Sequence, residues 1–274
     1  MSGVDLHVHT TASDGALTPS EVVQEAVARG LTAIAITDHD TTAGIDKALE
    51  AAKGTALEVI PGIELSAEWG SEETHILGYY LDYHDGALQE TLEILRQARR
   101  KRARKMVERL AGLEMPLCWD RVIEIAGESS AFGRPHIAQA LRERGYVASM
   151  NEAFDRYIGL GGPAHVSRYR LTPVEAIKMI TAASGLPVLA HPRGQEHILP
   201  ALVEAGLVGL EAYYPSYAIE ESEALVQLAK KYDLIATGGT DFHGHERFVT
   251  VGLGEVWVPL ESVERLCALA MNRS

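Results

Sequence analysis

Residues 4–9 read VDLHVH, a short apolar run that ends in two histidines. The run suits a β-strand, and in a strand the two histidine side chains point to the same face because side chains alternate. Residues 18–21, TPSE, then open a helix: the threonine caps it, the proline suits its first turn and the glutamate completes a capping box. This passage indicates a strand followed by a helix, the repeating unit of α/β folds.

The same rhythm continues through much of the chain. Further strands are predicted at residues 31–36, 57–63, 74–80, 186–190, 208–213, 234–237 and 249–258. Further helices are predicted at residues 43–53, 172–184, 197–205, 219–232 and 261–271. Apolar strands that alternate with helices indicate a parallel sheet covered by helices, and this number of strands favours a closed barrel over an open sheet.

One segment, residues 85–170, breaks this rhythm. It has long helical patterns and no convincing strand. It holds 15 basic and 11 acidic residues, a balance of +4, whereas the whole chain carries a net charge of −13. We interpret residues 85–170 as an all-helical cap inserted between two parts of a barrel, residues 1–84 and 171–274. The acidic total argues against a general nucleic-acid coat protein.

The composition is that of an ordinary globular protein, with 46% hydrophobic and 23% charged residues. No apolar run approaches the ~20 residues that span a bilayer, and the start has no basic-then-apolar leader. The chain has 2 cysteines, too few for a disulfide framework. We therefore expect a cytoplasmic protein with no membrane partner and no obligate protein partner.

Histidines and carboxylates gather at or just after the ends of predicted strands, except that His75 opens the fourth strand. The candidate metal ligands are His7, His9, Asp14, His39, Glu64, His75, His191, Asp241 and His243. The C-terminal ends of barrel strands meet at one mouth, so these residues should converge. A single catalytic zinc takes about three protein ligands, so this set fits two or three ions, with Glu64 as the bridge. Imidazole and carboxylate without thiolate suit Mn, Fe or Zn.

The same residues stand in motifs that resemble the PHP (polymerase and histidinol phosphatase) family. The motifs are DLHVHT at 5–10, TDHDT at 37–41, GIE at 62–64, His75, AHP at 190–192 and TDFH at 240–243. The resemblance covers most of the chain. It implies a distorted (β/α)7 barrel whose trinuclear metal site hydrolyses phosphate esters.

The resemblance also implies a distribution of the ligands. It assigns one metal ion to His7, His9, Glu64 and Asp241. It assigns a second to Glu64, His75 and His191, and a third to Asp14, His39 and His243. Some members have a histidine where Asp14 stands. Residues 10–15 and the helical insertion look most like the branch of nucleoside 3′,5′-bisphosphate phosphatases and related 5′–3′ exoribonucleases.

Clustered divalent ions, with Mn as the first choice, favour hydrolysis of an anionic ester. They polarise phosphoryl oxygens and lower the pKa of water. We expect water to attack phosphorus in line, without a covalent enzyme intermediate. Asp241, which would position or deprotonate that water, and His243 are the catalytic candidates. Cys118 and Cys267 lie away from the ligand motifs.

The cap segment supplies candidates for phosphate binding. Residues 96–105, RQARRKRARK, hold seven basic residues in ten. An apolar stripe at helical spacing runs through residues 88–110, and its extension predicts inward-facing side chains at Arg99 and at Arg102 or Ala103. The same pattern turns other basic residues to water: Arg100, Lys101 and Arg104. An inward-facing arginine needs an anionic partner, and its planar guanidinium group suits phosphate. The alternative is that residues 96–105 form a helix face that is simply solvated.

A second anion site is predicted at residues 133–136, GRPH, where Arg134 precedes a proline at a helix start. His136 and Arg168 are further candidates for substrate binding. Two or three phosphate-binding arginines suggest a small nucleotide with more than one phosphate. A nucleoside 3′,5′-bisphosphate fits, and its product would be a nucleoside 5′-monophosphate.

Other functions stay open. A 5′–3′ exoribonuclease acting on short 5′-phosphorylated RNA would use the same phosphate-binding arginines. A net charge of −13 disfavours the binding of long nucleic-acid polymers. Histidinol phosphate is another substrate that the family resemblance permits. A non-catalytic accessory domain would show eroded ligand positions, and this chain does not. An amidohydrolase acting on C–N bonds would use a similar metal cluster, but the crowded arginines argue against it.

Overall fold

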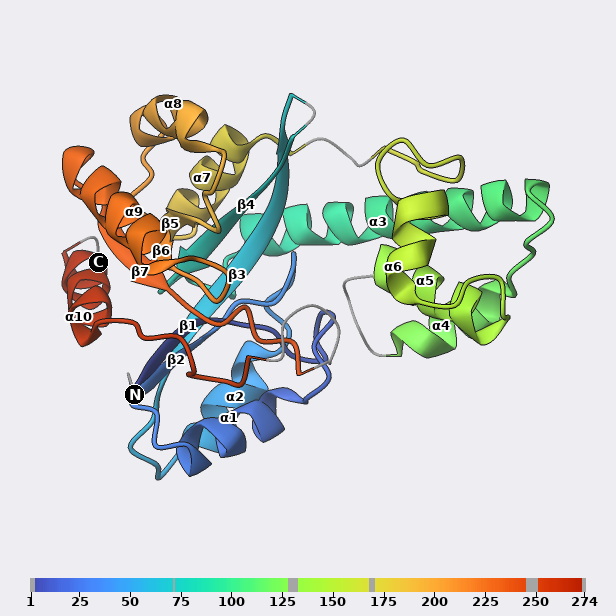
Figure 1. The fold of residues 1–274 in the computed structure, drawn as a ribbon. Helices are drawn as coiled ribbons and strands as arrows, with labels where there is room; N and C mark the ends of the chain where they lie inside the picture. Colours follow the sequence, from blue (N-terminus) through green and yellow to red (C-terminus); the bar gives the residue numbers. More distant parts are fainter. Residues whose placement is uncertain (1–2, 71, 128–132, 168–170, 245–250, 273–274) are drawn as a thin grey trace. The chain divides into compact units, whose positions relative to one another are not determined.

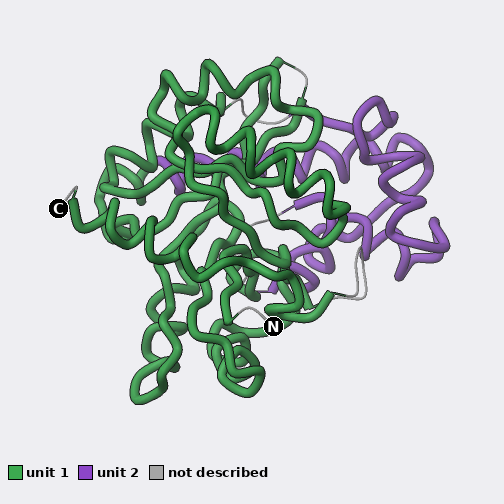
Figure 2. The backbone as a smooth tube through the Cα atoms, turned by 60° about the vertical axis from the view of Figure 1, so that its left-hand side comes forward, with its two compact units in different colours: residues 1–90, 170–274 green, residues 91–169 purple. Residues whose placement is uncertain are grey.

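The computed structural model describes the chain except for residues 1–2, 71, 128–132, 168–170, 245–250 and 273–274. The chain separates into two compact units, coloured separately in Figure 2. Unit 1 comprises residues 1–90 and 170–274, and unit 2 comprises residues 91–169. No helix in the described part of the chain has the length and apolar character needed to cross a membrane.

Unit 1 contains a sheet of seven strands that follow one another in chain order. The strands are β1 (Val4–Val8), β2 (Ala33–Ile36), β3 (Glu58–Trp69), β4 (Glu72–Tyr79), β5 (Leu186–Leu189), β6 (Gly209–Tyr213) and β7 (Ile235–Gly238). A parallel bridge between Val8 and Phe242 joins the end of β1 to the segment after β7. The sheet is therefore a nearly closed barrel, as the sequence predicted.

The prediction of a parallel sheet is wrong for β4. This strand pairs antiparallel with both β3 and β5, whereas the other pairs are parallel. Only two residues, Gly70 and Ser71, separate β3 from β4. A link this short makes a hairpin, because a parallel crossover needs about a dozen residues or more.

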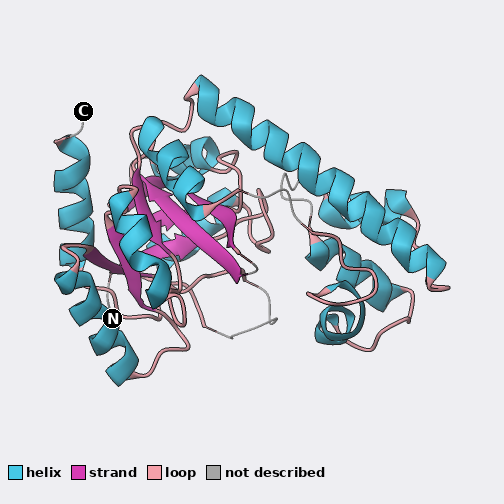
Figure 3. Ribbon diagram, turned by 90° about the horizontal axis from the view of Figure 1, so that it is seen from above, coloured by secondary structure: helices cyan, strands magenta, loops and turns pink. Residues whose placement is uncertain are grey.

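Helices lie outside the strands of unit 1 (Figures 1 and 3). They are α1 (Pro19–Ala28), α2 (Ile45–Ala52), α7 (Pro173–Ala182), the 3₁₀ turn Glu196–Ile198 with α8 (Leu199–Glu204), α9 (Ile219–Lys231) and α10 (Leu260–Met271). The predicted capping box is present: the Glu21 N–H donates to Thr18 Oγ1, and the Thr18 N–H donates to the Glu21 carboxylate. The side chains of β2 alternate between two hydrophobic cores. Ala33 and Ala35 belong to one, and Ile34 and Ile36 belong to another that includes residues of α1 and α2.

The predicted strand at residues 249–258 is wrong where it is described. Residues 251–258 contain a turn at 253–254 and a bend at 256 but no strand, and residues 249–250 lie outside the described residues. Gly254 adopts a φ of +73°, which breaks an extended strand. Its N–H donates to Asp5 Oδ2 at 2.8 Å, so this turn is tied to β1 by a side chain.

Every regular element of unit 2 among its described residues is helical. The elements are α3 (Gly86–Gly112, whose first turn belongs to unit 1), α4 (Trp119–Ala126), α5 (Arg134–Glu143), α6 (Met150–Ala153) and the π-helical turn Phe154–Ile158. Met106 and Leu110 of α3 pack in one core with residues of α4 and α5. The predicted orientation of α3 is confirmed: Ala103 is buried and Arg99 and Arg102 are half-buried. The basic residues predicted to face water are exposed: Arg100, Lys101 and Arg104.

Candidate metal centre

The two histidines of the first motif are fully buried and face an aspartate that follows β7. The Nε2 atoms of His7 and His9 lie 3.3 and 3.0 Å from Asp241 Oδ1. The same nitrogens lie 3.4 and 3.2 Å from Glu64 Oε2, which comes from β3. We name His7, His9 and Asp241 the first ligand group, because their donor atoms can hold one ion together.

Glu64 connects this group to a second one. The second ligand group consists of His39, Glu64 and His75. Glu64 Oε2 lies 2.9 Å from His39 Nδ1, and Glu64 Oε1 lies 2.8 Å from His75 Nδ1. His191, which follows β5, brings its Nε2 to 3.5 Å from Glu64 Oε1. The two oxygens of one buried carboxylate therefore face histidines from several strands.

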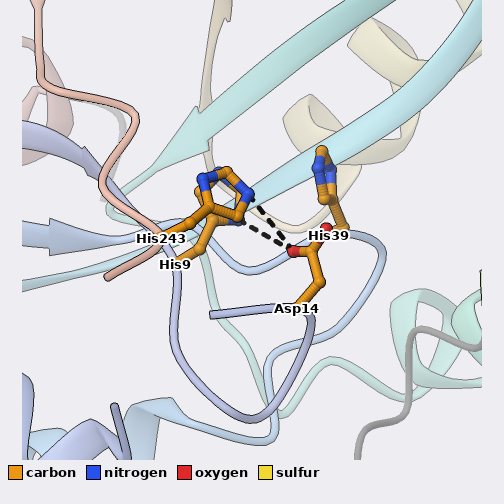
Figure 4. A group of neighbouring side chains, drawn as sticks. All are labelled: His9, Asp14, His39 and His243. Carbon is orange, nitrogen blue, oxygen red and sulfur yellow. Dashed lines mark ion pairs between the residues drawn. The ribbon is translucent and has the colours of Figure 1, made fainter. Parts of the chain in front are cut away.

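A third ligand group consists of His9, Asp14, His39 and His243 (Figure 4). Asp14 Oδ1 lies 3.4 Å from His243 Nε2 and 3.9 Å from His9 Nδ1. The His9 and His243 rings stack with their centroids 4.1 Å apart. His9 and His39 belong to this group and also to one of the others, so the three groups form one continuous cluster.

The structure thus brings all nine predicted ligands together in unit 1. Their grouping differs in part from the one that the family resemblance implied, because His9 also lies beside Asp14, and His39 also lies beside Glu64. As the sequence analysis expected, His75 lies near the start of its strand and not at a strand's C-terminal end. It reaches the cluster from the N-terminal half of β4, which runs opposite to its neighbours.

The cluster fits divalent metal ions. Seven buried donor atoms make no hydrogen bond within the described part of the chain: His7 Nε2, both ring nitrogens of His9, His39 Nδ1, both oxygens of Glu64 and His75 Nδ1. Buried polar atoms without hydrogen bonds are costly, and a bound ion would satisfy them. Two ligands that share an ion, each about 2.0–2.2 Å from it, lie about 3–3.5 Å apart, which matches the spacings of 2.8–3.5 Å found around Glu64 and Asp241.

The backbone is strained at three places beside the cluster. Asp40, His191 and Asp241 have φ values of 51°, 28° and 52°, in a region that residues other than glycine rarely adopt. Such strain persists where the surrounding contacts fix the chain, and it collects at functional sites. Two of these three residues are predicted ligands, so the strain coincides with the places where the side chains turn into the cluster.

The proximity of so many titratable groups shifts their pKa values. Burial alone would lower the pKa of His9 and His75, but nearby carboxylates outweigh it: Asp241 and Glu64 raise the pKa of His9 to about 10, and Glu64 and Glu73 raise that of His75 to about 9. Burial would raise the pKa of Glu64 and Asp241, but the histidines around them hold both well below the usual range. Without metal, protonated histidines therefore balance the negative charge of the ionised carboxylates.

We predict that the metal-free protein is most stable at mildly acidic pH. The raised histidine values contribute stability that is complete below about pH 6.5 and is lost as the pH rises through about 9 to 10. The lowered carboxylate values contribute stability above about pH 4.5 that is lost as the pH falls. The Tm of the metal-free protein should therefore be higher near pH 6 than near pH 10. A Tm that is equal at both would contradict this, and added Mn²⁺ should reduce the difference because ions replace protons.

Three residues that support the cluster were missed from the sequence. Glu211, in the middle of β6, contacts His7 Nδ1 at 3.0 Å. The Tyr214 hydroxyl donates to Asp241 Oδ2 at 2.9 Å. Asp38 accepts hydrogen bonds from the backbone and hydroxyl of Thr10, and so fixes the turn that carries Asp14. The one sequence signal for Glu211 that the analysis did not use is an acid inside the apolar run GLEAY at residues 209–213.

The predicted substrate-binding residues belong to unit 2. Arg102 donates from Nε to the Val166 carbonyl at 2.6 Å, and the Arg134 guanidinium lies over the Phe154 ring, 5.5 Å from its centroid. His136 is buried, and its Nδ1 accepts the N–H of Gly133 at 3.2 Å. Arg99 is half-buried on α3. Arg168 lies outside the described residues.

Comparison with known proteins agrees with the fold and the cluster. The family model of the PHP domain matches residues 5–166. The chain is 34% identical to a 3′,5′-nucleoside bisphosphate phosphatase of Chromobacterium violaceum, over 89% of this chain and 88% of that protein. It is 36% identical to the 5′-3′ exoribonuclease Rnm of Salmonella typhimurium, over 93% of this chain and 89% of that protein.

A solved structure has the same fold. It is a protein of Bifidobacterium adolescentis predicted to be a metal-dependent phosphoesterase, with a TM-score of 0.87 and 32% identity. The match covers 98% of this chain and 96% of that one. Together with the cluster of histidines and carboxylates, these matches establish that the chain belongs to the PHP domain family and is a metal-dependent phosphoester hydrolase.

Proposed function

We propose that this protein removes the 3′-phosphate of nucleoside 3′,5′-bisphosphates and releases nucleoside 5′-monophosphates. The observation that carries the proposal is the buried cluster of three overlapping ligand groups, combined with 34% identity to a phosphatase named for this reaction. We place the reaction in the cytoplasm, since Cys118 and Cys267 are both free thiols.

We propose two or three ions in the cluster, with Mn²⁺ as the first choice and Zn²⁺ or Fe²⁺ as alternatives. The mixed imidazole and carboxylate donors support this choice. When bound, such ions polarise phosphoryl oxygens and make water acidic enough to react near neutral pH. The three ligand groups, His7/His9/Asp241, His39/Glu64/His75 and His9/Asp14/His39/His243, would each supply one position.

Asp241 and His243 are the proposed catalytic residues. The low pKa of Asp241 keeps it ionised, so it can accept a hydrogen bond from water and orient it toward phosphorus. Tyr214 holds the other oxygen of this carboxylate at 2.9 Å and so fixes its orientation. His243 lies beside Asp14 at the more exposed side of the cluster, 27% accessible, where it can contact the substrate phosphate.

The second phosphate of the substrate is assigned to unit 2, the predicted cap. Arg99, Arg102 and Arg134 are half-buried arginines, and a guanidinium binds phosphate through two parallel hydrogen bonds. His136 and Arg168 complete the proposed set. A substrate with two phosphates uses both the metal cluster and these arginines, whereas a simple monoester uses the cluster alone.

The alternative function is a 5′–3′ exoribonuclease. The identity of 36% to an exoribonuclease supports it, as do the exposed basic residues of α3: Arg100, Lys101, Arg104 and Lys105. Each phosphate of an RNA chain needs a compensating cation, and a net charge of −13 disfavours a long contact. A short RNA end is therefore the form in which this function would occur.

A substrate panel distinguishes these functions. Mn²⁺-loaded protein is given a nucleoside 3′,5′-bisphosphate, a short 5′-phosphorylated RNA and histidinol phosphate, and the products are identified. We expect the highest kcat/KM with the bisphosphate, and a nucleoside 5′-monophosphate as product. Faster release of mononucleotides from the RNA would replace the proposal by the exoribonuclease. Loss of the 5′-phosphate instead of the 3′-phosphate would overturn the assignment of the two phosphates.

A further inference from the structure

Glu211 is a fully buried acid in the middle of β6 that contacts no described basic side chain except a metal-ligand histidine. Its Oε1 lies 3.0 Å from His7 Nδ1. Its Oε2 accepts the backbone N–H of His191 at 2.8 Å. One carboxylate thus connects the end of β1 with the end of β5, and both partners are ligands of the cluster.

The contact with His7 determines which ring nitrogen carries the proton. A carboxylate only accepts hydrogen bonds, so Nδ1 must be the donor. When the ring is neutral, as metal binding requires, Nε2 then presents its lone pair to the position between Glu64 and Asp241, whose oxygens lie 3.4 and 3.3 Å away. The proton placement that binds an ion through Nε2 is therefore selected by Glu211.

The contact with His191 holds its backbone. His191 has a φ of 28°, which a residue with a side chain does not adopt without support. The hydrogen bond from its N–H to Glu211 supplies that support. The ring Nε2 is thereby kept 3.5 Å from Glu64 Oε1, beside the second ligand group.

We propose that Glu211 is a positioning residue that aligns His7 and His191 for metal binding at two places in the cluster at once. Glu211 would orient the His7 ring toward a bound ion on one side, and it holds the backbone of His191 on the other. This role of Glu211 does not depend on which phosphoester is the substrate. A test of it is therefore independent of the proposed bisphosphatase activity.

The test is the substitution Glu211→Gln, which keeps the size of the side chain. Glu211 uses a different oxygen for each contact, Oε1 for His7 and Oε2 for His191. Glutamine has an NH₂ group in place of one of these oxygens, so it cannot accept a hydrogen bond at both positions. Titration of the metal-free protein with Mn²⁺, followed by calorimetry, should give an affinity about 10–100-fold weaker than that of the wild type. Activity should recover as Mn²⁺ is raised, because the ligands themselves are intact.

The matched control is Thr237→Val. Thr237 is buried on β7 directly opposite Glu211, and its hydroxyl donates to the Leu210 carbonyl. The Thr237→Val variant should have a lower Tm than the wild type and an unchanged affinity for Mn²⁺. If Glu211→Gln lowers the Tm and binds Mn²⁺ as tightly as the wild type, Glu211 is merely structural and the proposal is overturned.

A measurement on the wild type covers the case in which Glu211→Gln does not fold. Nitrogen NMR of histidine-labelled protein loaded with Zn²⁺, a diamagnetic probe, reports which ring nitrogen is protonated. We expect the His7 signal, assigned by its absence from His7→Asn, to have a protonated Nδ1 and a metal-bound Nε2. A His7 ring bound through Nδ1 overturns the proposal.

Discussion

Replacing Glu64 with glutamine should lower kcat by more than about a hundredfold. Loss of a residue that only hydrogen-bonds to a metal ligand already lowers metal affinity or activity by about 10–100-fold, and Glu64 is itself a proposed ligand. Both oxygens of Glu64 are buried without hydrogen bonds among the described residues, and they face ligands of every group. The histidines within 3.5 Å are His7, His9, His39, His75 and His191. An amide removes the negative charge and one of the two acceptors, so it weakens two ion positions together.

The measurement combines kcat with the number of bound ions per chain, determined by elemental analysis. We expect Glu64→Gln to bind fewer ions than the wild type and to stay inactive even in excess Mn²⁺. Glu68→Gln is the control, because it makes the same change four residues further along β3, outside the ligand groups. Glu64→Gln with near-normal kcat would show that the central carboxylate is not a metal bridge.

Several of the ligands could be read from the sequence because they interrupt the apolar pattern of their surroundings. His7 and His9 end an apolar strand, and Glu64 stands among buried aliphatic residues of β3. Polar side chains in such places are costly unless they bind something. The burial of Ala103 and the partial burial of Arg99 and Arg102 followed from the same kind of argument, since they extend the apolar stripe of α3.

The arrangement of these residues could not be predicted to the same extent. The direction of β4 depends on a two-residue link, and β3 extends to Trp69 through polar residues that do not look like a strand. His75 therefore reaches the cluster by a route that the sequence analysis did not foresee. Glu211 was missed because a single acid in a five-residue strand forms no recognisable spacing pattern. Its role depends on contact with His7, which lies 204 positions away in the chain.

Replacing Arg134 with alanine should lower kcat/KM for a nucleoside 3′,5′-bisphosphate by about 10–150-fold. This corresponds to the loss of a hydrogen bond to a charged group, about 1.5–3 kcal/mol. The same variant should hydrolyse p-nitrophenyl phosphate at nearly the wild-type rate, because that ester has no second phosphate to anchor. The folded state should be unaffected: Arg134 begins α5, and the core of unit 2 contains Ile137 and Leu141 from this helix rather than the arginine.

Arg134→Lys and Arg100→Ala separate the possible reasons for such a loss. Lysine keeps the charge but not the planar fork, and it cannot stack on Phe154 in the same way, so a specific anchor predicts only partial rescue. Arg100→Ala removes the same charge from an exposed position of α3, and surface charge alone contributes little. If Arg100→Ala weakens the reaction as much as Arg134→Ala does, the bisphosphate is attracted by the overall charge of the basic segment. If both substrates lose equally in Arg134→Ala, the arginine acts on the fold of unit 2 and is no phosphate anchor.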